Sequence, residues 1–366
     1  MNKIIWISAA VLSVAACAKN EVIPVNSGEN QEITFNVAPK TKADPQPQPG
    51  EFSTGNVFAS WAYYLPSGMN WKQNSGDAKE YISGATIVNN ANTEGKWKCE
   101  GKSYYWPKNG SLTFFAYSLN RDKLAFNDVV HGAQTPSFVD CHQSTGISAH
   151  LDLKIDPNVD FLVADPAYDK VLNESNYGAT GVPTLFRHKL SWIVVKVKAG
   201  NYKNKSFELQ SITFKIISSA AWYRQLADES NPSGFNPTSG SARNDVSYTT
   251  KVQLVPTDKL TDVAVNSSDH RYYIPQTFAD DSTIEVVYTI TTTVGSDTVT
   301  ENVKKTIQLN TLFQTVTDPA TSKVSGGWEM GKKYTINLTF TLDEILWDPA
   351  VQDWDVEGTT VDKTVA

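Results

Sequence analysis

Apolar and polar residues alternate along most of the chain, and this pattern predicts β-strands. In residues 32–38 the alternation places Ile33, Phe35 and Val37 on one face, which is the pattern of a strand with one buried side. Residues 333–342 alternate in the same way. No apolar stripe with helical spacing extends beyond about two turns, so long helices are not expected.

Turn residues between such segments predict hairpins. The strongest hairpin signal joins residues 283–290 to 299–309 across a Gly-Ser-Asp sequence at 295–297, because glycine and aspartate favour tight turns between strands. A second hairpin is expected between residues 96–99 and 104–106, across a Glu-Gly-Lys turn.

Residues 57–64 are apolar and aromatic, which suits a strand buried in a pleated sheet, and residues 111–117 are expected to form another strand after the turn at 107–110. Many strands separated by turns favour an all-β fold built from β-sandwiches. The 366 residues are enough for two domains of ordinary size. We place the boundary near residue 183, which gives an N-terminal domain over 32–182 and a C-terminal domain over 183–366.

The first 17 residues have the pattern of an export signal. A lysine precedes an apolar run over residues 4–14, which is too short to span a bilayer but suits a signal peptide over residues 1–16. Residues 13–17, Ser-Val-Ala-Ala-Cys, resemble a bacterial lipobox, in which Cys17 becomes the acylated first residue. The alternative is an ordinary signal peptide followed by a chance cysteine. Because several acyl chains hold a protein stably on a membrane, the lipobox predicts an outer-membrane lipoprotein precursor of a Gram-negative cell.

Two segments beside the first predicted strand have loop composition. Residues 17–31 are mostly polar and aperiodic, which predicts a flexible tether. Residues 39–50 contain four prolines, which remove backbone donors and disfavour both helix and sheet. This linker carries Lys40 and Lys42 and is expected to be exposed and extended.

Composition narrows the functional classes. The formal net charge is −7, and the 32 lysines and arginines form no basic stripe, so nucleic acid is not an expected partner. No nucleophile elbow, zinc-protease helix or phosphate-binding loop occurs, and neither an enzyme activity nor a cofactor is predicted. The 10 tryptophans and 15 tyrosines either fill sandwich cores or form platforms on which sugars stack; their place within strand patterns favours cores for most of them.

Cys99 and Cys141 remain once Cys17 is assigned to the lipid. In an exported protein the two can form a disulfide, but two cysteines do not make a disulfide framework, and free thiols are the alternative. His131 and His142 lie near Cys141 in sequence without the spacing of zinc ligands, so no metal site is expected.

Several segments together resemble the fimbrillin family of Bacteroidales, the subunits of type V pili, including its Mfa-like members. Besides the lipobox and the lysine-bearing linker, the segments that carry the resemblance are 33–37, 104–107 (YYWP), 112–117 (LTFFAY), 161–164 (FLVA), 185–191 (LFRHKLS), 194–197 (VVKV), 331–336 (GKKYTI) after Trp328, and 347–349 (WDP). Their order and spacing cover nearly the whole chain. One departure is Lys189, because the family commonly has a small residue after the histidine.

The resemblance implies two tandem transthyretin-like β-sandwich domains and assembly by strand exchange. A surface protease would cut the linker of the lipoprotein precursor. The first strand, with Ile33, Phe35 and Val37, would then leave a groove that the C-terminal segment of a neighbouring subunit fills. In the family the cut follows a basic residue. The matching residues here are Lys40 and Lys42, so an arginine-specific protease is a poor fit.

The resemblance places the donor segment in the C-terminal tail, residues 345–366. Trp354 and Val356 lie two residues apart, and Val361 and Val365 lie four apart, so each pair falls on one face of a strand. The alternative is that this tail up to Val356 is the last strand of its own domain and that the remainder frays.

These observations predict a structural pilus subunit, of the stalk or the tip, that reaches the outer membrane as a precursor and ends in a fimbrium on the cell surface. Its expected partners are other pilin subunits, in a homopolymer or heteropolymer, a surface protease, and the outer membrane through the lipid. The alternative is a monomeric outer-membrane lipoprotein that binds a glycan or another host ligand.

Overall fold

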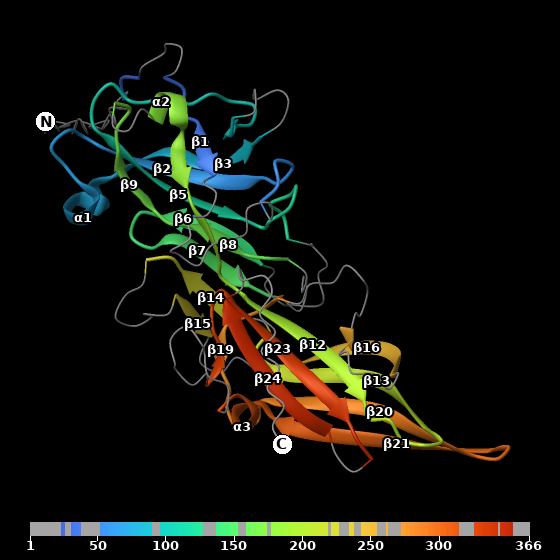
Figure 1. The fold of residues 1–366 in the computed structure, drawn as a ribbon. Helices are drawn as coiled ribbons and strands as arrows, with labels where there is room; N and C mark the ends of the chain where they lie inside the picture. The colour runs from blue at the N-terminus through green and yellow to red at the C-terminus, as the bar shows by residue number, and fades with distance from the viewer. Residues whose placement is uncertain are drawn as a thin grey trace, which may run out of the picture.

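The computed structural model describes residues 23–25, 31–37, 52–89, 96–126, 137–152, 159–173, 177–218, 221–226, 234–237, 243–254, 261–262, 272–314, 326–342 and 345–353. Over these residues the chain is almost entirely β, and the molecule is elongated, with the first half of the chain at one end and the second half at the other (Figure 1). The all-β fold class expected from the sequence is confirmed.

The strands of the first half are β1 (Phe35–Val37), β2 (Phe58–Leu65), β3 (Lys79–Val88), β4 (Lys98–Cys99), β5 (Ser111–Ser118), β6 (Phe138–His142), β7 (Gly146–Leu151), β8 (Leu162–Ala164), β9 (Ala167–Lys170), β10 (Val182–Thr184) and β11 (Phe186–His188). Those of the second half are β12 (Ser191–Ala199), β13 (Lys205–Ile216), β14 (Ala221–Arg224), β15 (Phe235–Pro237), β16 (Asn244–Leu254), β17 (Thr261–Asp262), β18 (Tyr272–Tyr273), β19 (Gln276–Thr277), β20 (Thr283–Val294), β21 (Asp297–Gln308), β22 (Gly327–Trp328), β23 (Lys332–Phe340) and β24 (Ile345–Asp353). The helices are short: α1 (Trp71–Asn74), the 3₁₀-helix η1 (Ser75–Asp77), α2 (Tyr177–Thr180) and α3 (Leu309–Phe313).

The central sheet of the first half has the order β11-β8-β5-β2-β3-β4, and β9 also pairs with β5. Its inner strands β2 and β5 are antiparallel, with Phe58 opposite Ser118. Both strands are buried along nearly their whole length, because other parts of the chain cover the sheet on both faces. Two-sided burial explains why residues 57–64 and 111–117 show no polar face in the sequence.

Each face of the central sheet has its own apolar cluster. Trp61 of β2 and Phe115 of β5 belong to a cluster that also contains residues of a second sheet, β15-β14-β7-β6. Phe58 and Phe114 lie on the opposite face of the sheet. They belong to a second cluster, together with residues of the first strand and β10. Successive side chains of a strand point to opposite faces, so one pair of strands contributes to both cores.

The second half of the chain forms a sandwich of two sheets. One has the order β17-β12-β23-β24, with β18 also paired to β12, and the other has the order β16-β13-β20-β21. β12 and β23 are parallel, with Ile193 opposite Tyr334. The large apolar cluster of this half contains residues of both sheets and of helix α3.

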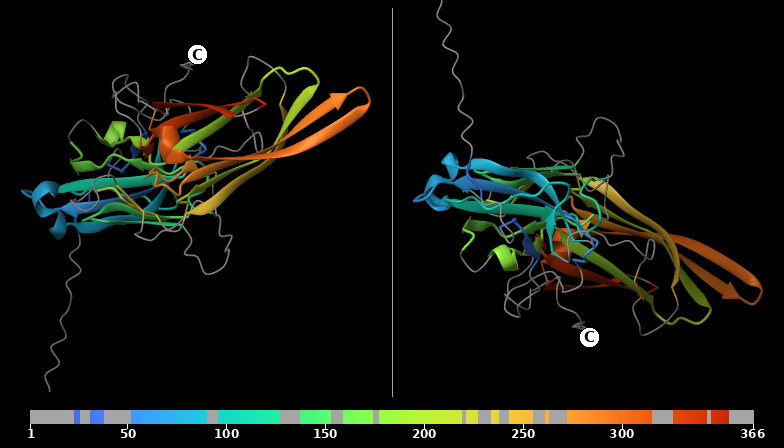
Figure 2. Two further views of the ribbon diagram at one scale, coloured as in Figure 1. Left: turned by 90° about the horizontal axis from the view of Figure 1, so that it is seen from below. Right: turned by 90° about the horizontal axis from the view of Figure 1, so that it is seen from above.

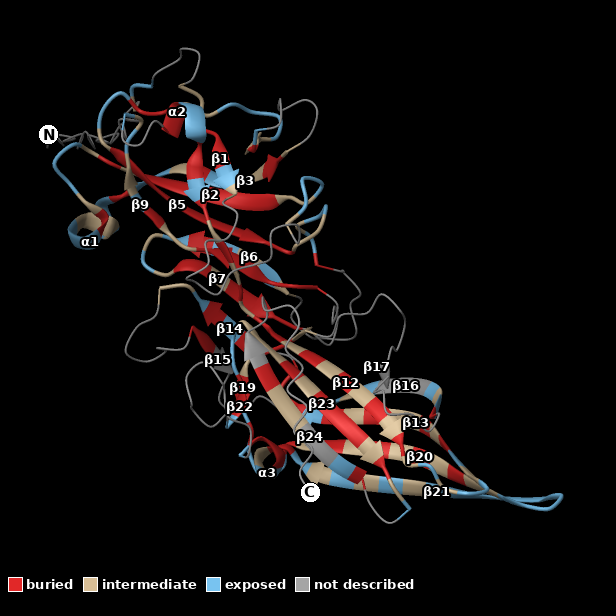
Figure 3. Cartoon of the chain, viewed as in Figure 1, coloured by how far each residue is buried: buried red, intermediate tan, exposed pale blue. Residues whose placement is uncertain are grey.

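The hairpin predicted around residues 295–297 is confirmed. β20 and β21 pair over their whole length up to Val294 opposite Asp297, and the turn residue Gly295 has a φ of 64°, a conformation that glycine adopts at no steric cost. The far end of this hairpin extends beyond the other strands (Figure 2). Its tip is exposed in Figure 3, and Val299 there is 69% exposed.

Strand pairing corrects the domain boundary expected near residue 183. β14 and β15 follow β13 in sequence but pair within the second sheet of the first half, with Tyr223 of β14 opposite Ala149 of β7. Tyr223 and Phe235 are buried in the cluster between this sheet and the central sheet. The ranges 32–182 and 183–366 therefore do not separate the sheets, because β14 and β15 complete a core that belongs to the first half.

The hairpin expected between residues 96–99 and 104–106 does not occur among the described strands. β4 pairs with β3 instead, and the carbonyl of Tyr104 accepts a hydrogen bond from the N–H of Ile33. The first strand therefore pairs with a backbone carbonyl that the sequence pattern had assigned to a local hairpin.

Candidate strand-exchange site

The first strand lies between two parts of the chain that come much later in sequence. On one side β1 runs parallel to β10, with Phe35 opposite Val182. On the other side the pairing is antiparallel. There the N–H of Ile33 donates to the carbonyl of Tyr104 at 2.8 Å, and the N–H of Phe35 donates to the carbonyl of Trp97 at 2.9 Å. The first strand is thus an inner strand, and its removal would leave unpaired backbone groups on both neighbours.

Side chains of the first strand fill the cluster beneath it. Ile33 and Phe35 are only 1% and 4% exposed, and Val37 is half-buried against the same cluster. The ring of Phe35 meets Phe58 and Phe114 edge to face, with ring centroids 5.5 and 5.8 Å apart. This is a favoured arrangement of aromatic rings, and it gives the strand a specific anchor in the core of the first half.

Gly181 sets how closely the first strand approaches β10. It follows helix α2 with a φ of 80°, and its N–H donates to the carbonyl of Tyr177, so it ends that helix in the left-handed conformation common at helix ends. A Cβ at this position would lie 2.8 Å from the carbonyl carbon of Phe35. The sequence pattern did not single out this residue, because a lone glycine before Val-Pro-Thr indicates only a turn.

A small polar cluster holds the half-buried start of the first strand. The carboxylate of Glu32 lies 3.0 Å from Nζ of Lys98 and accepts a hydrogen bond from the hydroxyl of Ser103 at 2.7 Å. Partial burial by itself would raise the pKa of Glu32, but the hydrogen bonds from Ser103 and Lys98 and the positive charges of Lys98 and Lys96 outweigh it, so the pKa lies below its usual value. The carboxylate is therefore favoured in its charged form at neutral pH.

The match to a known family covers most of these elements. A family model described as fimbrillin-like matches residues 67–354. This chain belongs to the fimbrillin-like family. The family resemblance inferred from the sequence segments is therefore confirmed.

Solved structures similar to this fimbrillin-like chain come from several Bacteroides species. A fimbrial protein from Bacteroides vulgatus ATCC 8482 is 16% identical with a TM-score of 0.60, and the match covers 88% of this chain and 99% of that one. A protein from Bacteroides uniformis ATCC 8492 described as a cell adhesion protein is 16% identical with a TM-score of 0.47, covering 88% and 99% of the two chains. A further one from Bacteroides ovatus ATCC 8483 is 17% identical with a TM-score of 0.43, covering 89% and 98%. No curated protein matches the sequence significantly.

Several of the predicted site residues of this fimbrillin-like chain lie outside the described residues. These are the lipidation residue Cys17, the linker lysines Lys40 and Lys42, and the tail residues Trp354, Val356, Val361 and Val365. The described part of the tail is β24, which pairs antiparallel with β23. Its residues Ile345 and Val351 are buried in the sandwich of the second half. Residues 345–353 therefore form a strand within the second half of their own chain. This agrees with the alternative expectation, in which the tail begins with the last strand of its own domain.

The disulfide that the sequence allowed between Cys99 and Cys141 is not made. Both are free thiols. Cys99 packs against the cluster on the first-strand side of the central sheet, whereas Cys141 is buried in the cluster on the opposite side. Burial raises the pKa of each thiol to about 12, so neither is a reactive thiolate at neutral pH.

Most described aromatic side chains of the fimbrillin-like chain serve the cores, as expected. The buried tryptophans are Trp61, Trp71, Trp97, Trp106 and Trp328. Trp222 differs, with 40% of its surface exposed.

Within the described residues, no three histidine, cysteine, aspartate or glutamate side chains gather in a way that could hold a metal ion. The same part of the chain contains no helix long and apolar enough to cross a bilayer.

Proposed function

We propose that this fimbrillin-like chain is a structural subunit of a cell-surface fimbria, of the stalk or the tip, and that it assembles by exchange of its first strand. The observation that carries the proposal is the position of residues 31–37. They form an inner strand of the first half, yet the segment between Val37 and Phe52 is the only covalent link between them and the strands from β2 onward. Their hydrogen bonds and buried side chains are those a replacement strand would have to supply.

Loss of the first strand would create a binding groove. Burying a side chain such as Ile33 or Phe35 contributes about 1.5–3 kcal/mol, and the emptied pocket would be lined by Phe58 and Phe114. The backbone groups of Trp97, Tyr104 and Val182 would lose their partners. An extended segment of another subunit would restore both contributions, as in other cases of β-strand addition.

The cut is proposed at Lys40 or Lys42, in the linker that follows the first strand. A cut there would leave residues 31–37 held by noncovalent contacts alone. The proline-rich sequence around the lysines has few backbone donors to engage in structure, which suits a protease substrate. The protease would be a lysine-cutting enzyme on the cell surface.

Before that cut, the chain is proposed to be an outer-membrane lipoprotein anchored through Cys17. The lipid would hold the precursor at the cell surface while the first strand fills its groove. One cut would then separate the folded protein from its anchor and open the groove, so export and assembly would be linked by a single step.

The test is limited cleavage of the purified precursor, without its lipid, by a lysine-specific protease. We expect a stable product that begins at Thr41 or Ala43, as shown by N-terminal sequencing, and that forms polymers visible by size-exclusion chromatography and electron microscopy. A Lys40→Gln/Lys42→Gln variant is the matched control and should stay intact in the linker and monomeric. A cleaved product that remains monomeric at high concentration would contradict strand exchange.

A second candidate function is that of a monomeric surface lipoprotein that binds a glycan or another host ligand. The observation that favours it is the exposed tryptophan Trp222 on the outer face of the β15-β14-β7-β6 sheet. The two candidates separate experimentally, because N-terminal sequencing of the protein recovered from cells shows whether the linker is cut.

A further inference from the structure

A row of three aromatic side chains crosses the outer face of the β15-β14-β7-β6 sheet. Phe138 of β6 lies opposite His150 of β7, and Trp222 of β14 lies opposite the same histidine. The neighbouring residues Ala149 and Tyr223 belong to the buried cluster. Because side chains alternate between faces along a strand, the aromatic row lies on the face turned away from that cluster.

The two outer rings of this row are exposed and the central ring lies beneath them. Phe138 and Trp222 are 41% and 40% exposed, whereas His150 is 7% exposed. The rings of Phe138 and His150 are stacked with centroids 5.7 Å apart, and Trp222 meets Phe138 edge to face at 5.6 Å. Single exposed apolar side chains are common on protein surfaces, whereas these two rings lie in contact with each other. These two are held in a fixed mutual orientation by the strands and by His150.

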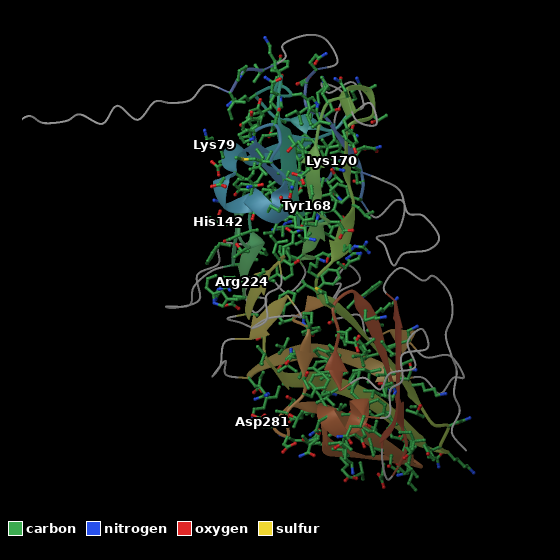
Figure 4. The ribbon with its side chains drawn as sticks, turned by 90° about the vertical axis from the view of Figure 1, so that its left-hand side faces the viewer. Lys79, His142, Tyr168, Lys170, Arg224 and Asp281 are labelled. Atoms are coloured by element: carbon green, nitrogen blue, oxygen red, sulfur yellow. The ribbon has the colours of Figure 1, made fainter. Side chains whose placement is uncertain are left out.

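A polar row lies beside the aromatic row. Two residues along from the aromatic row, Asp140 of β6 lies opposite Ser148 of β7. Arg224 of β14 lies opposite Ser148 from the other side. Asp140 and Arg224 are exposed, and their charges are opposite. Figure 4 shows Arg224 on the same side of the molecule as His142, the residue two positions beyond Asp140 on β6. Two residues along a strand span about 7 Å, close to the width of a sugar ring.

We propose that this face, formed by Phe138, His150, Trp222, Asp140 and Arg224, binds a neutral hexose unit of an oligosaccharide. A hexose has an apolar face of C–H groups, which suits the exposed faces of the two rings, and hydroxyl groups at its edge. A hydroxyl both donates and accepts hydrogen bonds, so it can pair with the carboxylate of Asp140 and with the guanidinium of Arg224.

Charge and size select this ligand among the alternatives. An acidic sugar would bring its carboxylate near Asp140, and the opposite charges of the polar row leave no net attraction for it. A protein partner of ordinary affinity covers about 800 Å² of each surface, whereas the apolar part of this face consists of two rings. In addition, Nδ1 of His150 is buried without a hydrogen-bond partner among the described residues.

This proposal deepens the second candidate function and rests on it; it does not depend on the proposed strand exchange, because the site uses β6, β7 and β14 and no residue of the first strand. The full chain, without its lipid, is tested on an array of neutral oligosaccharides of hexose and N-acetylhexosamine units, each printed beside its sialylated counterpart. Binding to a neutral glycan is then measured for Trp222→Ala and Phe138→Ala. Tyr168→Ala is the matched control, because Tyr168 of β9 is also 40% exposed but belongs to another sheet.

We expect binding to at least one neutral glycan, a loss of about tenfold or more in affinity for Trp222→Ala, a smaller loss for Phe138→Ala, and no change for Tyr168→Ala. Saturation transfer from the aromatic protons should reach the ring C–H protons of the bound sugar. Trp222→Leu, which retains apolar cover but lacks a flat ring, should lose binding as Trp222→Ala does, and it provides the test if the alanine variant unfolds. Absence of binding to every neutral glycan, a preference for the sialylated counterparts, or unchanged affinity in Trp222→Ala would each overturn the proposal.

Discussion

Gly181 and Phe35 are so close that no side chain fits between them: a Cβ built on Gly181 would lie 2.8 Å from the carbonyl carbon of Phe35 and 3.0 Å from the N–H nitrogen of Asn36. Both contacts are with backbone atoms, which cannot move aside as a side chain end can. The absence of a side chain at Gly181 therefore allows the backbone of the first strand to approach this closely.

We expect Gly181→Ala to loosen the first strand. The substitution introduces a backbone strain of about 1–2 kcal/mol, because φ is positive, and it also forces the strand away from β10. Gly68→Ala is the matched control, since Gly68 has a φ of 87° and open space around its would-be Cβ. Hydrogen exchange at the amides of Ile33 and Phe35 should accelerate in Gly181→Ala and stay unchanged in Gly68→Ala. Equal exchange in both variants would mean that the contact does not hold the strand.

We expect Phe35→Ala to be strongly destabilising. The ring fills a pocket between Phe58 and Phe114, and its removal leaves a cavity that costs about 3–5 kcal/mol. Val37→Ala is the comparison on the same strand, because Val37 is only half-buried and should cost much less. Urea unfolding measures both variants. A Phe35→Ala variant as stable as Val37→Ala would show that the first strand contributes little to the core.

The lowered pKa of Glu32 predicts a pH dependence. In the unfolded chain the group titrates near 4.5, and in the folded chain its pKa lies lower. The unfolded state therefore takes up the proton first, so the stabilisation is present above about pH 4.5 and is lost as the pH falls through the folded value. The difference in free energy of unfolding between the native chain and Glu32→Gln should shrink from pH 7 to pH 3. A difference that is constant over this range would contradict the role of the charge.

Lys189 predicts a second pH dependence, in the alkaline range. Burial lowers its pKa to about 8, the positive charge of Arg187 adds to this, and Asp165 offsets part of it. Between about pH 8 and the usual value of 10.5 the unfolded state binds more protons than the folded one, so the contribution of Lys189 to stability rises with pH.

We therefore expect Lys189→Met to be more stable than the native chain at pH 7, with an advantage that shrinks as the pH rises to 10. Lys215→Met is the control, because Lys215 is exposed on β13, and its effect should vary little over this range. Thermal melts at several pH values measure both. An advantage of Lys189→Met that grows with pH would refute the assignment.

The tail gives a prediction about assembly. If Trp354 and Val356 form the donor face, Trp354→Asp/Val356→Asp should abolish polymerisation of the lysine-cleaved protein, because two charged side chains cannot enter an apolar groove. Val361→Asp/Val365→Asp is the matched pair at the other candidate face. Light scattering after cleavage distinguishes them. Polymers formed by both variants would exclude either pair as the donor.

Local patterns were sufficient to predict much of the secondary structure. The alternation at 32–38 and 333–342 and the turn at 295–297 coincide with strands and a hairpin, because side-chain direction and turn conformation depend on a few adjacent residues. The apolar segments 57–64 and 111–117 are the inner strands of a sheet covered on both faces.

Pairing between distant segments was not predictable in this way. The aromatic segment 104–106 could have closed a hairpin with 96–99, but the first strand takes this place instead: its N–H groups donate to the carbonyls of Trp97 and Tyr104. Gly181 became important only because β10 brings it against Phe35. Phe138 and His150 face each other across the β6–β7 hairpin, but Trp222 comes much later in sequence, and only the pairing of β14 with β7 brings it into the same row.

The sequence by itself determined that this chain is an all-β member of the fimbrillin-like family with a buried first strand, because residue alternation and family motifs depend on residues that are close together in sequence. Only the tertiary structure decided which strands share a sheet, that β14 and β15 return to the first half, and that Cys99 and Cys141 lie in separate cores. The physical reason is that an unpaired strand edge can bond to any other edge. The choice among them depends on which pairing buries the most apolar surface over the whole chain, and no local pattern contains that information.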